Sequence, residues 1–131
     1  MRPKTPQGQS SMGDFQRLVE QALEGIAEPF RSKLENVAVV VEEEPSQLLL
    51  ESLGMPRGET LLGFYDGIPL TERGDWYNLA IPDRILIFRR PILSICSSPE
   101  EVREEVRRTV LHEVAHYYGI SDEELDSMGM G

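Results

Sequence analysis

The segment from Arg107 to Leu125 constrains the fold most, because it places His112-Glu113-x-x-His116 inside a helical pattern. Residues four apart lie one above the other on the same face of a helix, so both histidines can point a ring nitrogen at a single metal ion. Glu113 follows about 100° round the helix from His112. That position is beside the metal, where a general base for the attacking water is expected. The spacing therefore predicts an active-site helix that faces a cleft.

A catalytic zinc usually takes three protein ligands, and the third is expected just after this helix. Glycine is the default residue for ending a helix in the left-handed conformation, and Gly119 stands at the right place. A chain that reverses at Gly119 can bring Asp122 back under the two histidines. The competing carboxylates downstream are Glu123, Glu124 and Asp126.

Each of these residues also has a simpler interpretation. His112 and His116 can be ordinary surface or core histidines of an amphipathic helix. Ser121 to Glu124 reads as a capping box that opens a last short helix, which gives Asp122 a role at the helix start instead of at the metal. A closed structural zinc site is disfavoured, because such sites favour four ligands and often cysteine, whereas the chain offers two histidines and one cysteine.

The extended motif H-E-V-A-H-Y-Y-G-I-S-D resembles the zincin pattern H-E-x-x-H-x-x-G-x-x-H/D in its aspartate form. With the upstream runs Y-D-G-I-P-L-T-E-R-G and P-D-R-I-L-I-F-R-R-P-I, the chain is similar to a family of very small bacterial zincin-like metallopeptidases, from about Val37 to Leu125. The resemblance implies zinc as cofactor and a peptide or protein as substrate. It also implies an antiparallel edge strand above the metal that binds an extended peptide. The methionine turn of larger metzincins is not expected, because Met128 and Met130 lie almost at the C-terminus.

Composition narrows the class of protein further. The 131 residues suggest one domain, expected over residues 11–131, with residues 1–10 as a loose polar tail that lacks the apolar stretch of a secretory signal. The net charge of −10 disfavours nucleic acid and anionic membranes as partners. Cys96 is the sole cysteine, which fits a reducing compartment and a cytoplasmic location, and its expected role is that of a small buried hydrophobe.

Periodicity and turn residues predict an α+β domain. The expected architecture is zincin-like, with a small twisted mixed sheet packed on an N-terminal helix and the metal-binding helix, followed by a short C-terminal helix. Arg90-Pro91 disfavours helix at that point. Helices are expected at 11–26, 30–34, 46–53, 98–118 and after Ser121; strands are expected at 37–41, 61–65 and 85–88, the last two being candidates for the cleft rim.

These patterns predict a zinc-dependent peptidase that uses a metal-activated water. His112, His116 and Asp122 would hold one Zn²⁺ per chain, and Glu113 would be the general base. The alternative is a non-catalytic metal-binding or peptide-binding module on the same scaffold. Imidazole and carboxylate ligands also suit manganese, cobalt and nickel. The candidates for an oxyanion donor are Tyr117, Tyr118, Tyr77 and Arg73, and Trp76 could line the cleft or the core.

Overall fold

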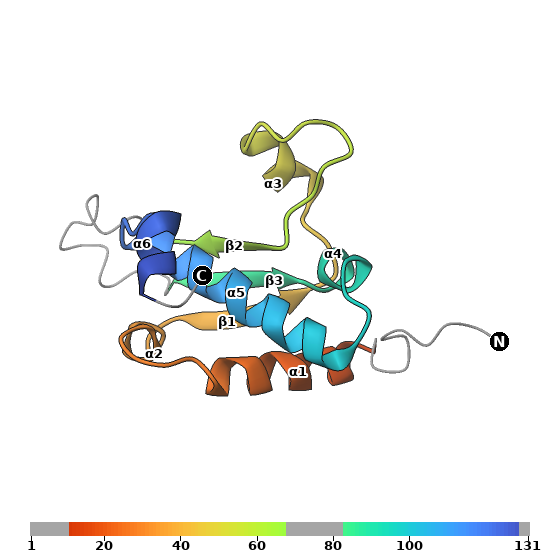
Figure 1. Ribbon diagram of the computed structural model, residues 1–131. Helices are drawn as coiled ribbons and strands as arrows, with labels where there is room; N and C mark the ends of the chain where they lie inside the picture. Colours follow the sequence, from red (N-terminus) through yellow and green to blue (C-terminus); the bar gives the residue numbers. More distant parts are fainter. Residues whose placement is uncertain (1–10, 68–82, 129–131) are drawn as a thin grey trace.

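The computed structural model describes residues 11–67 and 83–128 (Figure 1). The helices are α1 (Met12–Glu24), α2 (Phe30–Lys33), α3 (Gln47–Ser52), α4 (Arg89–Ser94), α5 (Pro99–Tyr117) and α6 (Asp122–Ser127). The strands are β1 (Ala38–Glu42), β2 (Gly63–Asp66) and β3 (Arg84–Phe88). The expectations for the tail at 1–10, for Arg73, Trp76 and Tyr77, and for Met130 lie outside the described residues.

The three strands form one mixed sheet in the order β1-β3-β2. β3 is central and pairs in parallel with β1, with Val39 opposite Ile85, and antiparallel with β2, with Tyr65 opposite Ile85. Ile85 and Ile87 are fully buried, as expected for an apolar β-branched strand inside a sheet. The prediction of a small mixed sheet is confirmed, and of the two candidate rim strands β2 lies at an edge whereas β3 does not.

Helix α5 is the central element of the fold and packs against α1, α2, α4, α6, β2 and β3 (Figure 1). Its valines at every fourth position, from Val102 to Val114, are completely or almost completely buried, and this apolar stripe forms the centre of the core. Burying a side chain of this size stabilises a fold by about 1.5–3 kcal/mol. The largest buried side chains around α5 are Phe15, Phe30, Phe88, Ile85, Ile87, Ile92, Leu111 and Leu125. Packing of the sheet on the N-terminal helix and the predicted metal helix is therefore confirmed.

Serine caps start the helices that the sequence marks. Ser11, Ser46 and Ser98 each accept a hydrogen bond from the backbone N–H three residues on. A full capping box at Ser98 would have the Glu101 carboxylate accept a hydrogen bond from the N–H of Ser98. Glu101 accepts its backbone hydrogen bond from Ser97, at 2.7 Å, and this bond lowers the pKa of Glu101.

Helix α4 is a correction to the sequence-based expectation, which disfavours helix at Arg90-Pro91. Pro91 is the third residue of α4, inside the first turn, where no intrahelical partner exists for a backbone N–H. Pro91 and Ile92 are both buried, and this packing offsets the restriction that proline places on Arg90. Cys96, just after α4, is a free thiol in the core cluster, as expected.

None of the helices within 11–67 and 83–128 combines the length and the apolar character needed to cross a membrane.

Candidate metal centre and active site

His112 and His116 lie on the same face of α5, one turn apart. Their rings are nearly parallel, with an interplanar angle of 10° and ring centroids 6.4 Å apart. Val110, Leu111, Val114 and Ala115 are buried in the core, so the packing of these neighbours turns the histidine face outward. His116 is exposed and His112 is half-buried. The helix thus presents two imidazoles side by side at the surface.

Gly119 reverses the chain directly after α5. Its φ of +77° lies in the left-handed region, which glycine adopts without a Cβ penalty. The N–H of Gly119 donates to the carbonyl of His116 and that of Ile120 to the carbonyl of Ala115, the pair of bonds that defines a Schellman motif. The half-buried Ile120 packs against the core, which fixes the direction in which the chain leaves the helix.

The reversal brings Asp122 to the second histidine. Asp122 Oδ1 lies 3.4 Å from Nε2 of His116. The capping box expected at this point is also present, since Ser121 Oγ accepts from the N–H of Glu124 and Glu124 Oε1 accepts from the N–H of Ser121. Asp122 therefore begins α6 and contacts His116 at the same time, whereas the competing carboxylate of Glu124 is engaged in the cap.

The carboxylate of Glu113 is directed toward the sheet. Its Oε1 accepts a hydrogen bond from the backbone N–H of Tyr65 on β2, at 2.8 Å. Burial raises the pKa of Glu113 above its ordinary value, while the Tyr65 N–H and the neighbouring His116 and His112 act in the opposite direction. The candidate base is thus half-buried between the histidine-bearing side of α5 and the edge strand β2.

A glycine brings β2 this close to α5. Gly63 is buried, and a Cβ there would lie 2.6 Å from Thr109 Cγ2 and 3.0 Å from the carbonyl oxygen of Leu86. From Thr109 to Glu113 the helix rises about 6 Å, and from Gly63 to Tyr65 the strand advances about 6.6 Å. The contact between Gly63 and Thr109 therefore places Tyr65 opposite Glu113.

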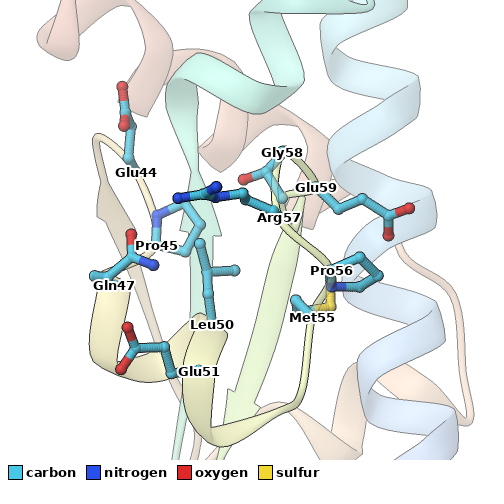
Figure 2. Close-up of a pocket in the computed structure, with 11 residues that line it drawn as sticks. Glu44, Pro45, Gln47, Leu50, Glu51, Met55, Pro56, Arg57, Gly58 and Glu59 are labelled. Carbon is cyan, nitrogen blue, oxygen red and sulfur yellow. The ribbon is translucent and has the colours of Figure 1, made fainter.

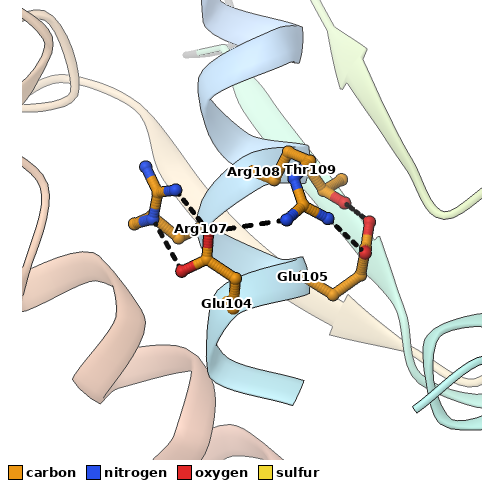
Figure 3. A network of polar contacts seen from close by, with 5 residues as sticks. All are labelled: Glu104, Glu105, Arg107, Arg108 and Thr109. Atoms are coloured by element: carbon orange, nitrogen blue, oxygen red, sulfur yellow. Dashed lines mark hydrogen bonds and ion pairs between the residues drawn. The ribbon is translucent and has the colours of Figure 1, made fainter. Parts of the chain in front are cut away.

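Charged side chains brace α5 beside this contact (Figure 3). Arg108 pairs with Glu105 at 2.8 Å and Arg107 with Glu104, and the latter pair lowers the pKa of Glu104. The hydroxyl of Thr109 lies 3.5 Å from Glu105, which turns its methyl group toward Gly63. Glu105 thus contacts both Arg108 and Thr109, and Thr109 lies next to Gly63 of β2.

The side chain of Tyr65 is also held. Its ring stacks on Tyr117 with centroids 4.3 Å apart, and its hydroxyl donates to Asp83 at 2.9 Å. Burial and this bond raise the pKa of Tyr65. Tyr118 lies under the ammonium group of Lys33, which is 4.2 Å from the ring centroid. Two of the tyrosines considered as oxyanion donors thus take part in packing contacts.

Sequence patterns do not identify three residues beside the candidate site, namely Tyr65, Gly63 and Asp83. Tyr65 acts through its backbone N–H, which every residue except proline carries, so its identity gives no signal. Gly63 did carry a signal, because an isolated glycine in a strand pattern marks a close approach of another element.

The side chains of His112, His116 and Asp122 are of types that bind zinc. In the structure His116 contacts Asp122, and its ring lies nearly parallel to that of His112. Within 11–67 and 83–128, no three His, Cys, Asp or Glu side chains gather closely enough to enclose a metal ion. His116 and Asp122 have side chains 59% and 67% exposed, so both can turn to a shared ion without disturbing the core. Two imidazoles and a carboxylate are a common donor set of catalytic zinc.

Comparison with known proteins identifies the family of the chain. A family model described as zincin-like metallopeptidase matches residues 34–131, and the chain belongs to this family. A solved structure of a conserved hypothetical protein from Thermus thermophilus is similar, with 26% sequence identity and a TM-score of 0.54. The match covers 90% of this chain and 99% of that one. No curated protein matches the sequence.

Proposed function

We propose that the protein is a zinc-dependent peptidase. The observation that carries the proposal is the position of Glu113, held between the histidine pair of α5 and the outer edge of β2. Membership of the zincin-like metallopeptidase family supports the same reaction class.

In this proposal His112, His116 and Asp122 hold the ion. Zinc, when bound, supplies Lewis-acid polarisation of the scissile carbonyl and of the attacking water. Glu113 takes the proton of that water and transfers it to the leaving amine, which ordinarily contributes about 10²- to 10⁴-fold to a rate. The hydrogen bond from Tyr65 fixes the orientation of the Glu113 carboxylate before the substrate arrives.

Within 11–67 and 83–128, β2 has no strand on the side away from β3, and this edge would supply the substrate site. Leu62 accepts a hydrogen bond from Phe88 of β3, so in the alternating antiparallel pattern the backbone groups of Gly63 and Tyr65 point away from β3. An extended peptide can add to the sheet there as a further strand. Such a peptide would pass directly beside Glu113.

A non-catalytic metal-binding or peptide-binding module is the second candidate. The packing contacts of Tyr117 and Tyr118 favour it, because a module that only binds needs no oxyanion donor. Both candidates bind metal and peptide, and only the first hydrolyses the peptide.

Glu113→Gln separates the two candidates. The protein is loaded with one equivalent of zinc and given a mixture of fluorogenic peptides. We expect wild-type protein to cleave them and Glu113→Gln to keep the zinc but lose about 10²- to 10⁴-fold in kcat/KM. Glu100→Gln is the matched control, the same change at an exposed position in the first turn of α5, and should cleave normally. Equal turnover by wild type and Glu113→Gln would contradict the assignment of the base, and no turnover by either would favour the module.

A further inference from the structure

Helix α3 stands apart from the packed body of the molecule, on the β2 side of the sheet (Figure 1). None of its residues is buried, although three of its six residues are leucines. Leu48 is 79% exposed, and Leu53 at its C-terminus is 45% exposed. An apolar element that the fold leaves uncovered is typical of a surface that binds another molecule.

A pocket of about 590 Å³ lies between α3 and the chain that leads from it to β2 (Figure 2). Leu50 and Met55 are the larger apolar side chains among its lining residues. Three glutamates, at positions 44, 51 and 59, stand around it, and Figure 2 shows their carboxylates spread along the rim. The pocket thus combines apolar side chains with an acidic rim.

The charges of the pocket do not cancel. Arg57 is the one cationic side chain among the lining residues, against the three glutamates. It makes no ion pair with any residue in the part of the chain that the structure describes. Glu44 has a contact of 3.7 Å with Arg90, which lies outside the pocket, and Glu51 and Glu59 have no such contact among the described residues. The rim therefore attracts cationic groups.

The pocket is continuous in sequence with the edge strand. Its last lining residues, Glu59 and Thr60, lead straight into β2 at Gly63. Tyr65 follows Thr60 by about five residues, a span of at most about 18 Å. A peptide paired with β2 therefore reaches the pocket within about five or six further residues.

We propose that this pocket binds a segment of the polypeptide substrate distant from the scissile bond, one that combines an apolar side chain with lysine or arginine. The inference rests on the proposed function for its claim that the bound polypeptide is a substrate. It adds a selectivity for basic, apolar sequences that the metal centre itself does not provide.

Binding of labelled peptides tests the proposal without any need for turnover. The probes are fluorescein-labelled peptides of about 16 residues, in which a Leu-Lys-Leu-Lys block or a Leu-Glu-Leu-Glu block lies about six residues to either side of the centre. Fluorescence anisotropy is measured with zinc-loaded Glu113→Gln protein. We expect at least one basic peptide to bind about 10-fold more tightly than its acidic counterpart at low salt, and the difference to shrink as salt is added.

Glu51→Lys/Glu59→Lys should remove most of this preference. Both residues are exposed, so the double substitution leaves the core unchanged. Glu20→Lys/Glu24→Lys, at exposed positions of α1, is the matched control for the change in total charge and should retain the preference. An unchanged preference in the pocket variant, or an equal loss in both variants, would overturn the proposal.

The outcome is separable from that of the proposed function. A preference that depends on the pocket, in a protein that cleaves nothing, supports the docking surface and contradicts the peptidase. Cleavage without such a preference supports the peptidase and contradicts the docking surface.

Discussion

The backbone N–H of Tyr65 donates to Glu113 Oε1 across the space between β2 and α5, at 2.8 Å. This bond joins β2, an edge strand that packs against α5, to the carboxylate next to the histidine pair. An edge strand ordinarily leaves such N–H groups open to a further strand. Here one of them orients the candidate base, so the proposed substrate edge and the proposed proton acceptor form one unit.

The close approach of Gly63 to Thr109 should be required for this unit. In Gly63→Ala the new Cβ would meet the Thr109 methyl and the backbone of Leu86, and the backbone cannot yield. We expect a loss of about 1–3 kcal/mol in the free energy of unfolding, because overpacking displaces neighbours. Peptide hydrolysis should fall as well, because β2 shifts away from Glu113. Urea denaturation and kcat/KM measure the two effects.

Gly13→Ala is the control for Gly63→Ala. Gly13 lies in α1, and a Cβ added there would have nothing within 4 Å. Alanine is preferred over glycine in a helix by about 0.5–1 kcal/mol, so this variant should be as stable as wild type or more stable. Similar behaviour of the two variants would show that Gly63 is not tightly packed.

The turn at Gly119 should matter for metal binding more than for folding. Alanine at φ +77° is strained, and Gly119→Ala should lose about 1–2 kcal/mol in stability. Because the same turn carries Asp122 to His116, zinc affinity should fall too. Isothermal titration with zinc, beside urea denaturation, measures both quantities.

Gly54 provides a matched comparison for Gly119. It ends α3 with φ +70° and the same pair of backbone bonds, from Gly54 to Glu51 and from Met55 to Leu50. Gly54→Ala should therefore carry a similar strain and leave zinc affinity unchanged. If both variants bound zinc as wild type does, the turn at Gly119 would have no part in the metal centre.

Cys96 should be unreactive in the folded protein at neutral pH. Burial, helped by Glu105 and Glu101, raises the pKa of the thiol to about 11. The thiolate is the reactive form, so at pH 8 only about one molecule in a thousand is reactive. Alkylation by iodoacetamide should accelerate as the pH rises toward 11, and should be fast in guanidinium at pH 8. Rapid alkylation of folded protein at pH 8 would contradict the buried position.

The same pKa shift predicts a loss of stability at high pH. The folded thiol keeps its proton above the pH at which the unfolded thiol ionises, near 9, so the folded state binds more protons there. The contribution of the thiol to the free energy of unfolding is fully present below about pH 9 and declines as the pH rises toward 11. Cys96→Ala should lack this component of the pH dependence.

Much of the fold follows from local signals in the sequence. Serine caps, the valine stripe of α5 and the apolar run of β3 all fall where the patterns place them. Helix α4 does not, because the tolerance of Pro91 depends on its place in the first turn and on burial that only the folded core supplies. The choice of β2 over β3 as the edge also required the tertiary structure, since both segments carry similar apolar patterns.

The candidate site was predictable only for residues that act through their side chains. His112, Glu113 and His116 are marked by chemistry and spacing, and the Gly119 turn by glycine. The role of Tyr65 is carried by its backbone and depends on contacts across 48 residues of sequence. No local pattern contains that information.

Metal content of the purified protein, measured beside His116→Ala and Asp122→Ala, is the decisive measurement for the metal centre. We expect one zinc per chain in the wild type, and loss or strong weakening of binding in both variants. Loss in His116→Ala alone would move the third ligand to another carboxylate or to water. Absence of bound metal in the wild type after zinc is supplied would contradict the account, and would return His112 and His116 to the role of ordinary helix residues.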